Sequence, residues 1–262
     1  MISITSAQLD AWLALFIFPL TRILGLLATA PVFNNGALPV RNRLILGLAV
    51  ALAVTTSLPA TTQVPAGSWL GFMVIFEQIL IGVLLGFALR IAFAAVDIAG
   101  ELIGLQMGLS FAVFFDPTSG GQTPVITEFL GLLTALIFLG LNGHLLTLSV
   151  LAESFDLLPI STTPFHAAAF STMLAWAATL FSTGLLLALP LITTLLITNI
   201  ALGVLARIAQ QLNLFAVGFP VTLAIGFLVL MLSLPFIGAA LEGIFSQGFY
   251  AMRAVMRAAA GT

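Results

Sequence analysis

The sequence predicts an all-α, polytopic integral membrane protein with long, kinked helices. Of its 262 residues, 61% are hydrophobic and 6% are charged, whereas about a quarter of the residues in soluble domains are charged. Apolar runs approaching the roughly 20 residues that a helix needs to cross a bilayer also recur along the whole chain. We therefore expect residues 1–262 to form a single membrane-embedded domain with no soluble domain beside it.

Six apolar segments follow one another, separated by polar breaks rich in proline, glycine and asparagine. They cover residues 11–32, 44–58, 69–96, 129–152, 167–206 and 215–241. Two of them fit a simple crossing badly, because the second is short and the fifth would run about 60 Å as one helix. Pro190 lies inside the fifth segment and favours a kink or a hairpin break there.

A C-terminal amphipathic helix is predicted over residues 241–259. Its apolar side chains recur at helical spacing, and Arg253 and Arg257 lie together on the opposite side. This pattern is typical of a helix that lies in a membrane interface. A docking face for another protein component is the alternative.

The residue content excludes several classes of chemistry. The chain has no cysteine, no lysine, and two histidines that lie apart in sequence. Disulfides, thiolate metal sites and a P-loop lysine are therefore absent, and neither an HExxH nor a GxSxG pattern occurs. We predict no catalytic residue, no metal site, no cofactor and no nucleic-acid partner.

Charged side chains inside the apolar segments are candidates for buried contacts. A charge at the centre of a membrane helix costs about 3 kcal/mol on insertion scales, so it usually faces protein or water. An ion pair between helices, a side chain that reaches the membrane surface, or a contact with another subunit would each satisfy this requirement. The candidates are Arg22, Glu77, Arg90, Asp97, Glu101 and Arg207.

The stretch from residue 97 to residue 108 combines carboxylates with regularly spaced glycines. Asp97 and Glu101 are four residues apart, so they share a helix face that we expect to meet a polar or watery environment. Gly100, Gly104 and Gly108 follow the same spacing and predict a seam where a second helix packs closely. The partner helix could belong to this chain or to another.

Three phenylalanines follow the glycine seam. Phe111, Phe114 and Phe115 precede Asp116 and a proline, which stop a helix and predict an apolar-tipped loop. Bulky apolar side chains of this kind form hydrophobic constrictions in water-filled paths. Core filling is the alternative explanation of the same residues.

These residues resemble the signature of the FliR family, the flagellar biosynthesis subunit of the type III protein export gate. The stretch that matches best is GELIGLQMGLSFAVFFDP, residues 100–117. Further stretches match in order: LTRILGLLATAPVF, LNGHLLTLSVLAESFDLLPI and LPLITTLLITNIALGVLARIAQQLNLFAVGFPVTLAIGF. The chain departs from the family in having Gln210 where a proline is usual.

The resemblance implies one protomer of a helical, pore-forming gate in the bacterial inner membrane, at the flagellar basal body. One copy would join FliP-like and FliQ-like subunits, with FlhB-like and FlhA-like export components nearby, and the gate would conduct unfolded secreted proteins. Because such gates are largely raised above the membrane plane, long helices would pack on neighbours instead of spanning lipid, with membrane lipid as a further partner. The family's plug loop matches Gln106, Met107, Gly108, Phe111, Phe114, Phe115 and Asp116.

Other functions fit the sequence less well. A secondary transporter favours paired, internally repeated broken helices around a site at mid-membrane, and we find no such pair. An ion channel built from several copies would use a ring of identical filter segments, which one sequence does not exclude. Within the family resemblance, a subunit of a virulence type III secretion system is the alternative to a flagellar one.

Overall fold

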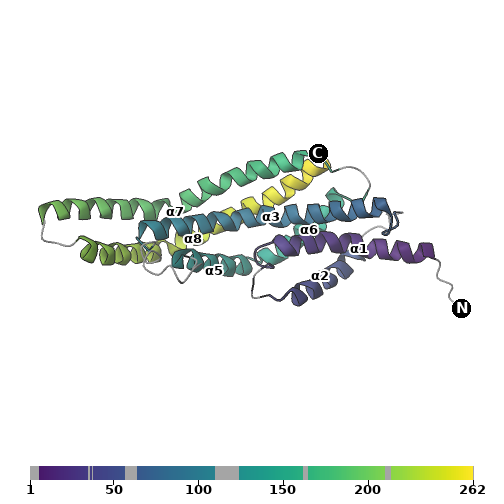
Figure 1. The fold of residues 1–262 in the computed structure, drawn as a ribbon, viewed down its shortest axis with the longest axis horizontal. Helices are drawn as coiled ribbons and strands as arrows, with labels where there is room; N and C mark the ends of the chain where they lie inside the picture. The colour runs from purple at the N-terminus through teal and green to yellow at the C-terminus, as the bar shows by residue number, and fades with distance from the viewer. Residues whose placement is uncertain are drawn as a thin grey trace. The chain divides into compact units, whose positions relative to one another are not determined.

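The computed structural model describes residues 6–34, 36, 38–56, 64–109, 124–161, 165–209 and 214–261. All regular secondary structure in these residues is α-helical (Figure 1). This confirms the predicted all-α class. The helices are α1 (Ser6–Thr29), α2 (Val40–Thr55), α3 (Trp69–Gln106), α5 (Val125–Gly140), α6 (Gly143–Leu157), α7 (Ala168–Ile208) and α8 (Leu214–Ala260).

The chain forms two compact units. Unit 1 consists of Met1–Ile91, Asn142–Ala177 and Ser246–Thr262, and unit 2 consists of Ala92–Leu141 and Ala178–Phe245. The three longest helices, α3, α7 and α8, contribute residues to both units.

Four described helices are long and apolar enough to cross a membrane. They are α3, α7 and the apolar parts of α1 and α8, and a fifth crossing arises if α5 and α6 count as one bent span. Helix α2 has 16 residues, fewer than the roughly 20 that a crossing needs, as the short predicted segment suggested. The helices thus have the lengths expected of a polytopic membrane protein.

The predicted segment 129–152 is two helices. Helix α5 ends at Gly140, and helix α6 begins at Gly143. Asn142 sits at the junction as the N-cap of α6, in the left-handed conformation with φ 57°. Asparagine tolerates this conformation better than most residues, and its carbonyl accepts the first hydrogen bonds of α6. The break between the two helices therefore has a local cause at Asn142.

Helix α7 runs through Pro190 without interruption, so the predicted hairpin break is wrong. Its 41 residues correspond to about 60 Å of helix. Proline removes one backbone donor from this helix. Next to it, the hydroxyls of Thr193 and Thr194 donate to the carbonyls of Leu189 and Pro190 at 2.7 and 2.9 Å. Polar side chains thus supply additional hydrogen bonds beside the proline.

The segments 215–241 and 241–259 join in one helix, α8, of 47 residues. The apolar face predicted for its C-terminal part is buried by the chain itself: Met252, Val255 and Met256 are fully inaccessible to solvent. These side chains are therefore core residues of unit 1 and are not left for a membrane surface or for a docking partner.

Each unit has an apolar core. In unit 1, Phe18 packs with Ala14 and Val74, which joins α1 to α3. In unit 2, the rings of Phe93, Phe138 and Phe245 lie 5.2–5.4 Å apart, which joins α3, α5 and α8. Ring pairs at this separation favour edge-to-face and tilted arrangements.

Candidate functional site

Glycines bring α1 and α3 into direct contact within unit 1. A Cβ atom on Gly82 would collide with the carbonyl group of Arg22, and one on Gly86 would collide with the hydroxyl of Thr29. From the other side, a Cβ on Gly25 of α1 would lie 2.8 Å from a carbonyl oxygen of α3. Such close backbone approach is what small residues permit in membrane helix pairs.

Arg22 is completely buried and extends from this crossing into a polar network. Its Nε donates to the side-chain oxygen of Gln78 at 2.8 Å. One terminal nitrogen donates to the carbonyl and hydroxyl of Ser154 at 2.8 and 3.2 Å, and the other donates to the carbonyl of Leu158 at 2.8 Å. The guanidinium carbon also lies 4.1 Å from the centre of the Phe155 ring. One side chain thus links α1, α3 and α6.

The electrostatics of α6 explain why a cation fits there. The carbonyls of Ser154 and Leu158 lie at its C-terminal end, where the helix dipole leaves partial negative charge. A guanidinium presents its donors as a planar fork that reaches several acceptors at once. The charge is therefore satisfied inside the chain by dipoles and hydrogen bonds. Glu77, the neighbour of Gln78, is half-buried nearby and adds a favourable charge interaction with Arg22.

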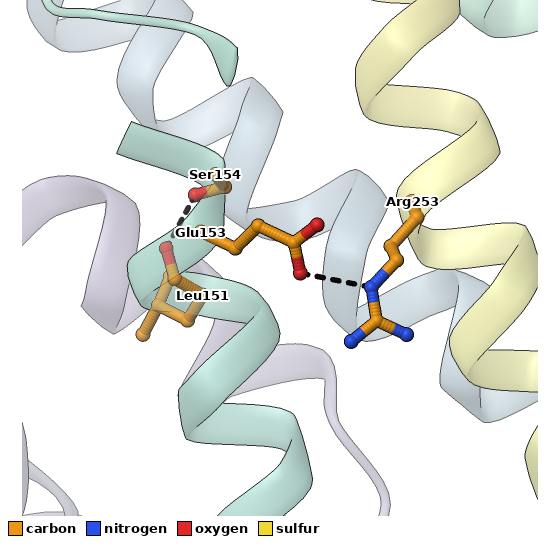
Figure 2. A network of polar contacts seen from close by, with 4 residues as sticks. All are labelled: Leu151, Glu153, Ser154 and Arg253. Atoms are coloured by element: carbon orange, nitrogen blue, oxygen red, sulfur yellow. Dashed lines mark hydrogen bonds and ion pairs between the residues drawn. The ribbon is translucent and has the colours of Figure 1, made fainter. Parts of the chain in front are cut away.

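A second polar contact ties α6 to α8. The Nε of Arg253 donates to a carboxylate oxygen of Glu153 at 2.8 Å, and both side chains remain more than one-third exposed (Figure 2). The neighbouring Ser154 hydroxyl donates to the carbonyl of Leu151 at 2.6 Å within α6. Exposed ion pairs contribute about 0–1 kcal/mol, so this contact is far weaker than the Arg22 network.

The other predicted charged candidates lie at the surface of the chain. Arg90, Asp97 and Glu101 are exposed on α3, and Arg207 is exposed in the last turn of α7. None of them is buried as Arg22 is. A polar environment or a contact with another subunit stays a prediction for these four residues.

The glycine seam of unit 2 lies against α5. A Cβ on Gly100 would lie 2.6 Å from the Cα of Thr127, whereas one on Gly104 would meet Ile126 at an ordinary 3.9 Å. Gly108 lies beyond the end of α3 and has φ 83°, so it does not continue the helix face. Within the described residues, the closest approach is therefore at Gly100.

This difference yields a matched pair of variants. Both Gly100→Ala and Gly104→Ala gain up to about 1 kcal/mol of helix propensity. Only the methyl group on residue 100 meets backbone atoms of Thr127, so we expect Gly100→Ala to lower the thermal unfolding midpoint of the purified protein and Gly104→Ala to leave it unchanged or raised. Equal midpoints for the two variants would contradict a tight contact at Gly100.

The predicted plug residues divide into two groups. Gln106 is the last residue of α3, and Met107 follows it with a completely buried side chain. Phe111, Phe114, Phe115 and Asp116 lie outside the described residues. The structure thus describes the end of the helix that leads to these residues.

Several contacts were not predicted from sequence. Gln78, Ser154 and Phe155, which complete the Arg22 network, were missed. The only signal for Gln78 was a second polar residue beside Glu77 in an apolar run. Trp176 was missed too; its indole N–H donates to the carbonyl of Ala88 at 2.8 Å and joins α7 to α3 in unit 1.

Comparison with known proteins gives consistent matches over most of the chain. The family described as "Bacterial export proteins, family 1" matches residues 13–248. Flagellar biosynthetic protein FliR of Pectobacterium carotovorum subsp. carotovorum is 47% identical, and that of Escherichia coli (strain K12) is 44% identical; in both cases the match covers 95% of each chain. The protein of the same name from Aquifex aeolicus is 35% identical over 87% of this chain and 88% of its own. The chain therefore belongs to family 1 of the bacterial export proteins.

Proposed function

We propose that the chain is a structural, pore-forming subunit of the flagellar type III protein export gate, through which unfolded flagellar proteins cross the bacterial inner membrane. The observation that carries the proposal is near full-length similarity, at 47% and 44% identity, to proteins named for flagellar biosynthesis. The role is non-enzymatic.

The surfaces of α7 and α8 support a place inside an assembly. In the most apolar 18-residue window of each helix, 17% is buried within the chain, compared with 61% for α3. Among the exposed residues are Phe181, Ile197, Phe227, Leu232 and Phe236. So much apolar area needs lipid or protein to cover it. We propose FliP-like and FliQ-like subunits as neighbours, with FlhB-like and FlhA-like components close by.

The proposed obstruction of the closed gate consists of Phe111, Phe114 and Phe115. Replacing all three with alanine should remove the apolar blockage and leave the contact at Gly100 intact. We expect the assembled complex to persist and its ionic conductance to rise in planar bilayers, with export retained or released from its usual control.

The same variant separates this role from core packing. If the three rings fill a core, losing them costs several kcal/mol of apolar burial, and the complex should dissociate without any leak. Native mass spectrometry and conductance are therefore measured on the same preparation. An intact triple-alanine complex that does not leak would contradict the obstruction.

A further inference from the structure

Helix α3 ends at a well-defined point in unit 2. The N–H of Gly108 donates to the carbonyl of Leu105 at 3.1 Å, and the N–H of Leu109 donates to the carbonyl of Gly104 at 3.0 Å. With φ 83° at Gly108, this pair of bonds is the Schellman motif that terminates many helices. The direction in which the chain leaves α3 is therefore set within one turn.

The residue just before this turn is inserted into α8. The side chain of Met107 is completely buried. Its Cγ and Cε lie 2.7 Å, and its sulfur lies 2.9 Å, from the position that a Cβ on Gly226 would take. These distances are shorter than real Cβ contacts, so any side chain on residue 226 would force Met107 out of its present position.

The backbone of Met107 is held by the same face of α8. Thr222, one turn before Gly226, is almost completely buried. Its hydroxyl lies 3.3 Å from the carbonyl oxygen of Met107 and 3.0 Å from that of Phe219. The last carbonyls of a helix have no partner within that helix. The single hydroxyl proton of Thr222 can be donated to the Met107 carbonyl or, within α8, to the nearer Phe219 carbonyl.

We infer that Thr222 and Gly226 form a seat on α8 that positions the end of α3 through Met107. The inference rests on the proposed function, because the seat matters for export only if the residues after α3 obstruct the gate. Met107, Thr222 and Gly226 are then positioning residues: they do not block the path themselves, but they fix the point from which the phenylalanine-containing segment starts.

Exchanging volume across the contact tests the seat. Met107→Ala empties it, and Gly226→Val fills it from the other side. We expect each variant to raise the conductance of the assembled gate, because the end of α3 loses its fixed position. The double variant restores a similar total of side-chain volume, since valine adds three carbon atoms where methionine loses its last three heavy atoms. We therefore expect the conductance of the double variant to be as low as that of the unmodified protein.

Controls separate this outcome from general damage. Gly238→Val places the same side chain on the same helix at a position where a Cβ has nothing within 4 Å. The conductance of this variant should stay as low as that of the unmodified protein. If Gly226→Val prevents assembly, Met107→Ala still reports on the seat because it adds no volume. Two results would overturn the inference: assembled single variants that do not leak, or a double variant that leaks as much as either single one.

The alanine variant of the three phenylalanines distinguishes the two proposals. If that variant leaks and the seat variants do not, the obstruction stands and the seat is wrong. If that variant is tight, the obstruction itself is wrong, and the seat has no role in closing the gate.

A cysteine pair tests the contact directly in the assembled complex. The chain has no native cysteine, so Met107→Cys combined with Gly226→Cys creates the only thiols in it. The Cγ of Met107 lies 2.7 Å from the Cβ position of residue 226, so the two Cβ atoms would lie no more than about 4.2 Å apart, below the upper limit for a disulfide. We expect rapid cross-linking under mild oxidation in the assembled gate, and its absence would contradict the seat.

Discussion

Replacing Arg22 with alanine is expected to destabilise unit 1 by roughly 3–5 kcal/mol. The substitution removes the partner of the Gln78 side chain and one partner each of the Ser154 and Leu158 carbonyls. It also leaves a cavity in a fully buried place, which adds the cost of lost packing. We expect a much lower thermal unfolding midpoint in detergent and little assembled complex in membranes.

Two variants control for charge and for the loss of any arginine. Arg22→Lys keeps the positive charge, but lysine has no planar fork of donors and cannot reach all the acceptors. Its thermal unfolding midpoint should therefore lie between those of Arg22→Ala and the unmodified protein. Arg253→Ala removes an arginine from a half-exposed ion pair and should cost no more than about 1 kcal/mol. If Arg22→Ala and Arg253→Ala destabilised the protein equally, the buried Arg22 network would not stabilise unit 1 as described.

Replacing Gly82 with leucine is expected to separate α1 from α3 at a cost of about 3 kcal/mol, near the upper end for an overpacked contact. Even the first carbon of the new side chain would collide with the carbonyl group of Arg22. Because the carbonyl group of Arg22 belongs to the backbone, it cannot rotate out of the way as a side chain can. The Arg22 network should therefore be disturbed as well, since its backbone would move.

A leucine elsewhere controls for the change in composition. Gly243, in α8, has nothing within 4 Å of a Cβ, so Gly243→Leu should leave the unfolding midpoint of the purified protein unchanged or raised by the gain in helix propensity. Limited proteolysis of both variants would show whether α1 is the element released. A Gly82→Leu protein as resistant as the Gly243→Leu protein would contradict the close crossing.

Parts of the chain differ in how far they satisfy their own contacts. Unit 1 buries Arg22 with a hydrogen-bond partner for each of its three guanidinium nitrogens and covers the apolar face at the end of α8. The long helices α7 and α8, in contrast, leave most of their apolar residues uncovered by the chain itself. This contrast fits a protomer that completes part of its packing alone and relies on neighbours for the rest, as the proposed gate requires.

Composition and run length were sufficient for the fold class and for most helix positions. The start of α3 at Trp69 and the span of α7 follow from apolar runs, because a backbone in lipid must satisfy its own hydrogen bonds and only a helix does so within one segment. The charged candidates included Arg22, which the structure buries, and four residues that it leaves exposed, because the rule that an ionisable group must find protein or water does not say which of the two.

Tertiary structure decided which contacts those residues make. The sequence spacing treated Gly100, Gly104 and Gly108 alike, yet α5 approaches closely at Gly100, and Gly108 ends the helix. Likewise, a proline signal in α7 was compatible with a break that does not occur. Spacing along a helix determines which residues share a face. The distance from each of these residues to the backbone of a neighbouring helix depends on how the two helices pack. For the same reason, the partners of Arg22 come from residues more than fifty positions away, and the chain order alone carries no signal for them.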